Sequence, residues 1–270
     1  MTKNAMAVLV ALGLAVGISS SAHAVTQFVQ NGSFETLTTT PGGSTAGTAG
    51  QLDFNTYATG WSNTVNGNVG YNFVFSPTTL ATTSGTIADN GGANGVDGNL
   101  QLWGPGNGSA NGLTKSPDGG NFVAADGAYE VEPLTQTITG LTVGQNYAVN
   151  FWWAGAQQSG FSGPTTDLWT VGLNPVGQSS DTQSTGTVSL PSHGFTGWQQ
   201  QTFNYTATSN TEVLSFLATG TPNGEPPFAL LDGVSMIATP EPSSFITMGV
   251  GALVLGMFIR RRVRSNKDAA

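Results

Sequence analysis

Turn dipeptides constrain the fold of this chain more than any other feature. Between Val25 and Thr239 the sequence holds seven Asn-Gly and four Asp-Gly dipeptides, both of which favour the positive φ angles of tight turns. Short stretches rich in Val, Thr, Phe, Tyr and Trp lie between them, and none shows a sustained helical period. The pattern predicts a nearly all-β body, and its roughly 215 residues are enough for one sizeable core.

The clearest predicted strand covers residues 145–154, where apolar side chains alternate. The residues of one parity, which we expect to face the core, are Tyr147, Val149, Phe151 and Trp153. Other predicted strands are 28–35, 71–75, 100–103, 121–125, 130–138, 167–173, 199–207, 212–218 and 228–237. About eight to ten strands around one core predict an all-β jelly-roll sandwich.

The N-terminal residues read as an export signal. Lys3 supplies a positive charge, residues 5–16 are apolar, and Ala22 and Ala24 flank one residue in the small-x-small pattern that signal peptidase needs. We therefore expect residues 1–24 to be a signal peptide, and residues 25–238 to be the exported domain. The sequence has no cysteine, so this domain gains no stability from disulfides.

The C-terminal residues form a second targeting segment, at 239–264. Its parts in order are Pro240, Glu241 and Pro242, an apolar run at 245–259, and the basic residues Arg260, Arg261, Arg262 and Arg264. As a helix the apolar run would be about 22 Å long, somewhat short of the roughly 30 Å of a bilayer core. The arginines favour a cytoplasmic C-terminus, so the pattern predicts a helix that enters the inner membrane at least transiently. A buried core helix is the alternative.

Charge excludes one class of function. Lys115 is the only basic residue between Val25 and Thr239, against thirteen acidic residues, which gives 1 − 13 = −12. Such a domain repels nucleic acid and attracts divalent cations. We therefore expect no nucleic-acid partner.

The tail resembles the PEP-CTERM sorting signal of Gram-negative bacteria, because the Pro-Glu-Pro triplet, the apolar run and the arginine cluster follow one another in the same order. The resemblance implies recognition by an exosortase in the inner membrane, after signal peptidase has acted. It also implies removal of the helix and release to the cell surface or into an exopolysaccharide matrix, as in a biofilm.

The body resembles the galactose-binding-like jelly rolls that often carry such tails. The matching stretches are 31–35 (Asn-Gly-Ser-Phe-Glu), Gly60-Trp61, 136–141 with Gly144 and Tyr147, and 230–235 (Leu-Leu-Asp-Gly-Val-Ser). The sequence departs from the pattern at Gly233, where Asn or Asp is more common. The resemblance implies that Glu35 and Asp232 share a structural calcium ion, whose six to eight oxygen ligands would be completed by carbonyls and water. The alternative is that Glu35 caps a turn and Asp232 accepts backbone hydrogen bonds.

A second group of acids offers a weaker cation site. Asp89, Asp97, Asp118 and Asp126 all lie beside Gly or Asn, where solvated turn residues are the favoured interpretation.

Catalysis finds little support in the sequence. His193 is the only histidine of the predicted domain, and its adjacency to Ser192 does not make a triad. Glu130 and Glu132 fall on one face of a predicted strand, so their Cα atoms would be only about 7 Å apart rather than across a substrate. We expect a protein that is not an enzyme.

Sugar binding is the remaining functional candidate. Flat aromatic faces with amide or carboxylate groups nearby are suited to pyranose rings. The aromatic residues with such neighbours at predicted strand ends are Trp103, Tyr129, Trp152 and Trp169, for each of which a buried core position is the alternative. The sequence thus predicts an exported, non-catalytic module that associates with polysaccharide. A purely structural matrix or coat protein and a glycan-acting enzyme remain as alternatives.

Overall fold

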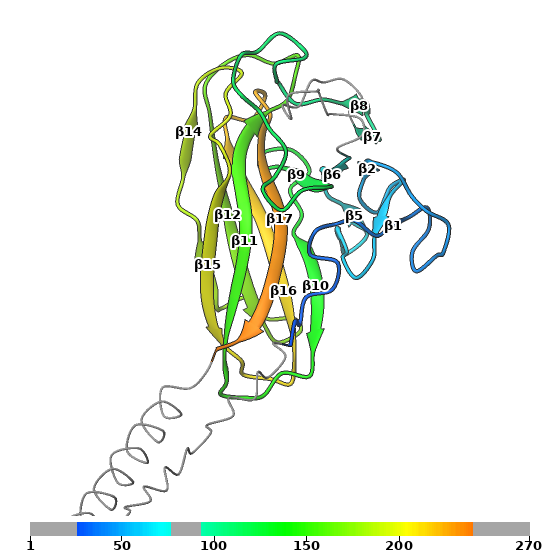
Figure 1. Cartoon of the computed structure of the whole chain (residues 1–270), viewed down its shortest axis with the longest axis vertical. Helices are drawn as coiled ribbons and strands as arrows, with labels where there is room; N and C mark the ends of the chain where they lie inside the picture. Colours follow the sequence, from blue (N-terminus) through cyan, green and yellow to red (C-terminus); the bar gives the residue numbers. More distant parts are fainter. Residues whose placement is uncertain (1–25, 77–92, 240–270) are drawn as a thin grey trace, which may run out of the picture.

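The computed structural model describes residues 26–76 and 93–239, and these residues form a β-sandwich (Figure 1). The smaller sheet contains, in order, β10 (Leu134–Thr139), β16 (Thr211–Thr221), β12 (Thr165–Asn174) and β13 (Thr182–Ser184), while β14 (Val188–Leu190) also pairs with β12. The larger sheet runs β15 (Gln199–Thr206), β11 (Asn146–Gln157), β17 (Pro227–Ala238), β9 (Phe122–Asp126), β6 (Asn72–Phe75), β2 (Gly50–Gln51), β7 (Ala93–Gly95) and β8 (Gly98–Leu100). Two small hairpins pair β1 (Leu37–Thr38) with β3 (Tyr57–Ala58) and β4 (Thr64–Val65) with β5 (Asn68–Val69).

The long strands show jelly-roll connectivity. In chain order, β10, β11, β12, β15, β16 and β17 alternate between the smaller and the larger sheet. Their pairings are antiparallel, as are all the strand ladders of the described residues except that of β2 with β7. The prediction of an all-β jelly-roll sandwich is therefore confirmed.

The core lies between the two sheets, and the alternation predicted for residues 145–154 is confirmed. Tyr147, Val149, Phe151 and Trp153 are all buried in the main apolar cluster. From the facing sheet Trp169 and Phe216 pack into the same cluster, and their ring centroids lie 6.0 Å apart.

A second apolar cluster covers the outer face of the larger sheet. Ala154 and Ala156 of β11 face it, together with Phe228 and Leu230 of β17. The segment from β8 to β9 closes over these residues with Leu102 and Leu113, among others. Two other members of this cluster, Tyr71 and Leu100, also line a cavity.

Two predicted strands differ from the structure in kind: the predicted strand 100–103 overlaps β8 only at Leu100, and the predicted strand 28–35 is absent. Residues 28–35 contain no strand, because Asn31 and Phe34 both have positive φ values, of 51° and 55°. The segment still runs beside β17, with Phe28 N donating to Met236 O and Val234 N donating to Gly32 O, both at 3.0 Å. The opening and closing motifs therefore lie side by side, as the resemblance implied.

Another predicted strand begins later than expected. Strand β10 starts at Leu134 rather than at residue 130, since Pro133 lacks the N–H that a ladder needs. Glu130, with a φ of 42°, and Glu132 therefore lie in the loop before the strand. The prediction that these two acids share a strand face is wrong.

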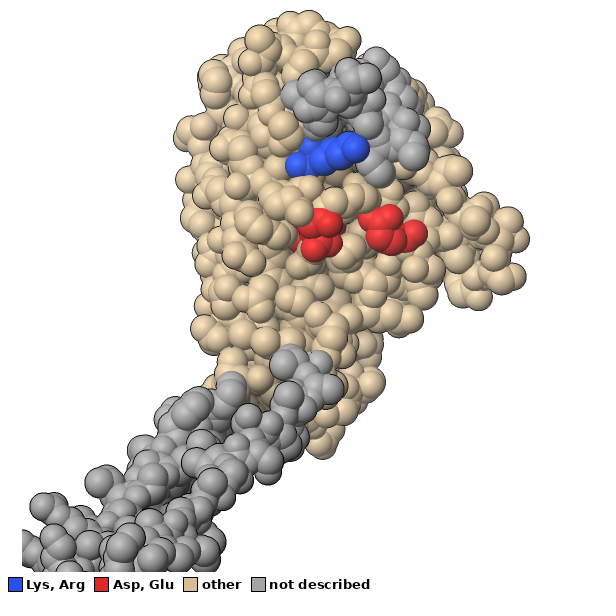
Figure 2. Space-filling model, viewed as in Figure 1, with Lys and Arg blue, Asp and Glu red and all other residues tan. Residues whose placement is uncertain are grey.

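The targeting segments cannot be compared with the structure. The signal-cleavage residues, the Pro-Glu-Pro triplet, the apolar run 245–259 and the arginine cluster lie outside the described residues. Within residues 26–76 and 93–239, no helix is long and apolar enough to cross a membrane. Figure 2 shows one face of the described domain, on which basic and acidic side chains form small separate patches.

Candidate functional site

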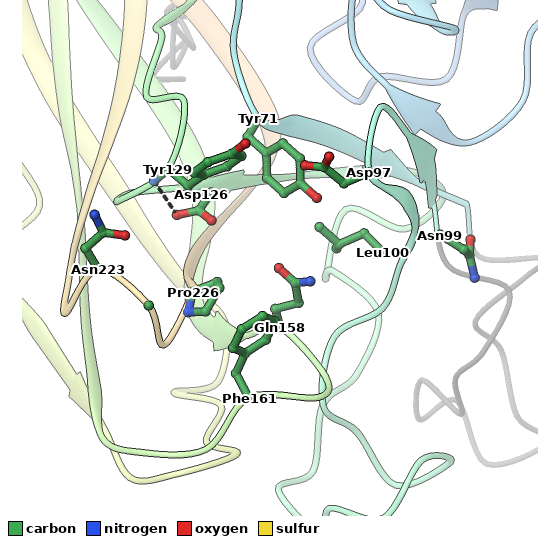
Figure 3. Close-up of a pocket in the computed structure, with 11 residues that line it drawn as sticks. Tyr71, Asp97, Asn99, Leu100, Asp126, Tyr129, Gln158, Phe161, Asn223 and Pro226 are labelled. Atoms are coloured by element: carbon green, nitrogen blue, oxygen red, sulfur yellow. Dashed lines mark hydrogen bonds between the residues drawn. The ribbon is translucent and has the colours of Figure 1, made fainter.

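A cavity of about 410 Å³ opens on the outer face of the larger sheet (Figure 3). We call it the Tyr129 cavity. Tyr71 directly precedes β6, Asp97 sits at the tip of the β7–β8 hairpin, and Asp126 ends β9. The remaining lining residues are Asn99, Leu100, Tyr129, Gln158, Phe161, Asn223, Gly224 and Pro226. Loops from both sheets thus meet at one place, where a jelly roll can vary its sequence without disturbing its core.

Tyrosine rings form one side of this cavity, and Phe161 lies at the other (Figure 3). Tyr71 and Tyr129 pack edge to face, with ring centroids 5.1 Å apart, and Tyr71 packs in the same way on Phe73 at 4.6 Å. Tyr71 is buried, whereas Tyr129 is 44% exposed and Phe161 is 37% exposed. The buried ring holds Tyr129 in place, and the two exposed rings are free to contact a ligand.

Asp126 contributes a carboxylate with one unused oxygen. Its Oδ1 accepts hydrogen bonds from the backbone N–H groups of Ala128 at 2.8 Å and Tyr129 at 3.1 Å. Its Oδ2 is buried without a hydrogen-bond partner. Burial raises the pKa of Asp126 to about 6, although the two backbone hydrogen bonds act in the opposite direction.

Acidic groups also surround the two tyrosine hydroxyls. The charges of Glu130 and Asp97 raise the pKa of Tyr129, and burial together with Asp97 and Asp126 raises the pKa of Tyr71 to about 12. Both phenols therefore stay protonated in neutral solution and can donate hydrogen bonds. Figure 3 shows Tyr71, Tyr129 and Asp97 gathered at one side of the cavity, with Gln158 and Phe161 at the opposite side.

The four aromatic residues predicted from the sequence do not form one site. Tyr129 lines the cavity. Trp103 supports it, because its indole N–H donates to Phe161 O at 2.8 Å and its ring stacks on His193 at 4.0 Å. Trp152 lines a different cavity, of about 590 Å³, together with Asn150 and Gln200.

The prediction for Trp169 is wrong. Its side chain is 0% exposed, and its indole N–H donates to Leu230 O at 3.0 Å inside the core. Trp169 has the parity of the core-facing residues of β12, and this alternation was a signal for its burial.

Sequence reasoning missed Tyr71, Gln158 and Phe161 as lining residues. Phe161 could have been named from the sequence, because it is a lone aromatic residue in a Ser- and Gly-rich loop. Such a position exposes apolar surface to water. Tyr71 gave no such signal, because its pattern is that of an ordinary strand residue.

The acids of the opening and closing motifs come together in the cavity that Trp152 lines. Glu35 and Asp118 line it. Burial raises the pKa of the nearby Asp232 to about 8, hydrogen bonding by the Ser116 hydroxyl and the Gly233 N–H lowers it, and the charges of Asp118 and Glu35 raise it further. Glu35 Oε1 accepts the Asn121 N–H at 2.5 Å, and Asp118 Oδ2 accepts the Ser33 hydroxyl at 2.5 Å. Asp232 is buried, its Oδ1 accepts the Gly233 N–H at 2.7 Å, and its Oδ2 has no partner.

This acidic cluster is an all-oxygen donor set, of the kind that calcium prefers. Asp232 Oδ2, which is buried without a hydrogen-bond partner, is the oxygen of this cluster that could ligate a cation. Even so, no three His, Cys, Asp or Glu side chains of the described chain are already grouped tightly enough to hold a metal.

His193 contacts Ser162 rather than Ser192, its neighbour in the sequence. Its Nε2 lies 2.8 Å from Ser162 Oγ, whereas Ser192 Oγ accepts the Gly163 N–H at 3.0 Å. Among the hydrogen bonds between described residues, none joins a carboxylate to the His193 ring. The arrangement ties two loops together and lacks the orienting acid of a catalytic triad.

Comparison with known proteins agrees with part of this description. The PEP-CTERM protein-sorting motif matches residues 238–262. No curated protein matches the sequence.

Several solved structures are similar in fold. One is a CBM4 structure, with 15% identity and a TM-score of 0.31, covering 66% of this chain and 92% of that chain. Another is the CBM22-1 xylan-binding domain from Paenibacillus barcinonensis Xyn10C, with 11% identity and a TM-score of 0.35, covering 82% of this chain and 99% of that chain. A third is the arabinose-bound MgGH51 α-L-arabinofuranosidase, with 15% identity and a TM-score of 0.37, covering 78% of this chain but 26% of that chain.

The C-terminal match corresponds to the Pro-Glu-Pro triplet, the apolar run and the first arginines. The chain is therefore an all-β jelly roll that carries a PEP-CTERM protein-sorting motif, which implies export and sorting by an exosortase.

Proposed function

We propose that the exported domain is a non-catalytic carbohydrate-binding module that associates with extracellular polysaccharide, and that the Tyr129 cavity holds the sugar. The observation that carries this proposal is the pairing of two exposed rings, Tyr129 and Phe161, with amide and carboxylate groups in one cavity. Aromatic faces pack against the apolar side of a pyranose, while Gln158, Asn223 and Asp97 supply hydrogen-bonding groups for its hydroxyls. The buried Tyr71 keeps the exposed ring of Tyr129 oriented before the ligand arrives.

A calcium ion is the second part of the proposal. Glu35 and Asp232 would hold it, with Asp118 beside them, and the ion would fix the opening segment against β17. Support comes from the buried Asp232 Oδ2, which has no partner in the described structure. An ion that binds only the folded domain stabilises that domain by mass action.

The third part concerns location. We expect the exported protein to reach the cell surface or the extracellular matrix of a Gram-negative bacterium, where a polysaccharide-binding domain would keep it in an exopolysaccharide or biofilm matrix after removal of the sorting helix. The sorting motif supports the export and sorting part of this proposal.

Affinity electrophoresis tests the sugar-binding claim. The mature protein is run through native gels that contain xylan, galactan, mixed-linkage β-glucan, chitosan or alginate, each with and without calcium. We expect at least one polysaccharide to retard the mature protein and the Tyr129→Ala variant to lose most of that retardation. Val176→Ala is the matched control, since Val176 is 71% exposed and lines no part of the cavity.

Two other outcomes would replace the proposal. Absence of retardation in every gel would favour a structural matrix or coat protein without a sugar site. Release of reducing sugar from a polysaccharide, abolished by Glu130→Gln, would instead make the protein a glycan-acting enzyme.

A further inference from the structure

A second cavity lies next to the Tyr129 cavity. It has a volume of about 480 Å³ and is lined by residues of four segments: Gln51 and Phe54, Gly67 to Val69, Val96, and Glu130 to Glu132. We call it the Phe54 cavity. Its lining comes largely from the part of the chain that precedes β6, where β4 and β5 form a separate hairpin.

The two cavities meet along two pairs of consecutive residues. At the tip of the β7–β8 hairpin, Val96 lines the Phe54 cavity and Asp97 lines the Tyr129 cavity. In the loop before β10, Glu130 lines the Phe54 cavity and its neighbour Tyr129 lines the Tyr129 cavity. Consecutive Cα atoms are about 3.8 Å apart, so a single residue's width separates the two cavities. The two cavities therefore share a rim at both places.

The junction is held in a fixed position. Val96 N donates to Gln51 Oε1 at 2.9 Å, and the Gln51 side chain also donates from Nε2 to Gly70 O at 3.1 Å, although Gln51 itself is 1% exposed. On the other side Tyr71 N donates to Glu130 O at 2.9 Å. One rim is thus anchored to the buried Gln51 side chain and the other to the backbone of Tyr71 next to β6, which gives the pair of cavities a preformed geometry.

The Phe54 cavity offers an aromatic face to solvent. Phe54 is 49% exposed, Val96 is 52% exposed and Val131 is 37% exposed, and all three line it. Single exposed apolar residues are common, but three that line one concave surface form a contiguous patch of the kind found at ligand grooves. Phe54 follows Asp53, whose carboxylate accepts the Asn63 N–H at 2.6 Å and so fixes the loop that presents the ring.

Charge narrows the ligand class. Asp97, Asp126, Glu130 and Glu132 line the two cavities, while Lys115, the only Lys or Arg within residues 26–76 and 93–239, lines neither. A uronate chain would bring carboxylates next to these acids without a cation to offset them, and like charges at such distances repel. Neutral sugars escape this repulsion, and protonated amino sugars gain an attraction.

We infer that the Tyr129 and Phe54 cavities are consecutive subsites of one groove for a linear, uncharged or cationic polysaccharide, with Phe54 as the second stacking platform. This inference rests on the proposed function and extends it, because it assigns both a chain-length requirement and a charge class to the ligand.

The test compares long and short ligands on the mature protein obtained by export of the full chain. The probes are xylan, galactan and chitosan, the monosaccharides derived from each, and alginate as the uronate. We expect Phe54→Ala to weaken binding of the retained polysaccharide about tenfold, as expected for loss of one half-buried aromatic contact, and to leave monosaccharide binding in the Tyr129 cavity unchanged. Phe54→Tyr should keep wild-type affinity, and Val176→Ala is again the control.

The outcomes separate this inference from the proposed function. If Tyr129→Ala abolishes binding while Phe54→Ala has no effect on the polysaccharide, the proposed function stands and the second subsite is refuted. If alginate binds as tightly as the neutral chains, the charge argument is refuted. If no probe binds the wild-type protein, both the proposed function and the two-subsite groove are overturned.

Discussion

Asp167 offers the sharpest test of how the sandwich core is built. It lies on β12, is 0% exposed, and neither of its carboxylate oxygens has a hydrogen-bond partner. It packs against Gly155 of the larger sheet, where a Cβ atom would lie 3.0 Å from Asp167 Oδ2 and 2.9 Å from a methyl carbon of Leu190. Burial in these surroundings raises the pKa of Asp167 well above its usual range, and the charge of Asp126 acts in the same direction.

The sign of the pH effect follows from the raised pKa. The folded protein keeps the Asp167 proton at pH values where the unfolded chain, with a pKa of about 3.9, has lost it. The contribution of Asp167 to the free energy of unfolding is therefore fully present below the unfolded pKa and is lost as the pH rises toward the folded pKa. Over that range each pH unit lowers the free energy of unfolding by about 1.4 kcal/mol through this one group.

Asp167→Asn removes the titration and keeps nearly the same shape. The amide also lacks partners, but its desolvation cost does not change with pH. We expect the unfolding free energy of the variant, relative to wild type, to increase between pH 4 and pH 6 by up to about 2.4 kcal/mol, because the unfolded carboxyl is already about half ionised at pH 4. For a domain of this size that upper value corresponds to about 5–10 °C in Tm.

Urea denaturation of both proteins at pH 4, 5 and 6, followed by tryptophan fluorescence, measures this difference. Asp126, whose pKa is raised to about 6, titrates in both proteins, and its contribution is the same in both as long as Asp167 is neutral in wild type, as the asparagine is in the variant. Parallel stability curves for wild type and variant over this range would refute the claim that Asp167 is buried as a neutral acid.

Three further predictions follow from other parts of the molecule. Calcium should raise the Tm of the mature protein and EDTA should lower it, whereas Glu35→Gln should abolish most of the calcium response; an unchanged midpoint in EDTA would remove the ion from the account. Trp169→Phe should lower the free energy of unfolding by about 1–3 kcal/mol, because the indole hydrogen bond to Leu230 O is lost and a cavity remains; a smaller loss in urea denaturation would mean that the core repacks. The intact mass of the protein from its native host should correspond to a chain that begins at Val25 and ends near Pro242, and a mass that retains residues 245–270 would show that the apolar run stays attached.

The fold was predictable because the alternation of apolar residues along a long strand determines which face of that strand is buried. In β11 the parity of Tyr147, Val149, Phe151 and Trp153 fixed which face is buried, and the structure follows it. The same rule applied to β12 would have placed Trp169 in the core, where it lies. The segment 28–35 shows the limit of the rule, since two residues with positive φ keep it out of the sheet although its composition is that of a strand.

The candidate site was only partly predictable, because it is made by loops that the sequence does not place in space. Tyr129 could be named from its neighbours, but its partner Tyr71 lies 58 positions earlier in the sequence and reaches it through the pairing of β6 with β9. Phe161 and Asn223 come from loops that follow β11 and β16. Likewise, the proximity of Asp118 to Glu35 and Asp232 depends on how the segment between β8 and β9 folds back.

The most direct test of the central claim is a crystal structure of the mature protein with an oligosaccharide derived from the polysaccharide that it retains. The account predicts electron density for a sugar ring against Tyr129 and Phe161, within hydrogen-bonding distance of Gln158 or Asn223. Density for the sugar against Trp152 instead, with an empty Tyr129 cavity, would contradict it.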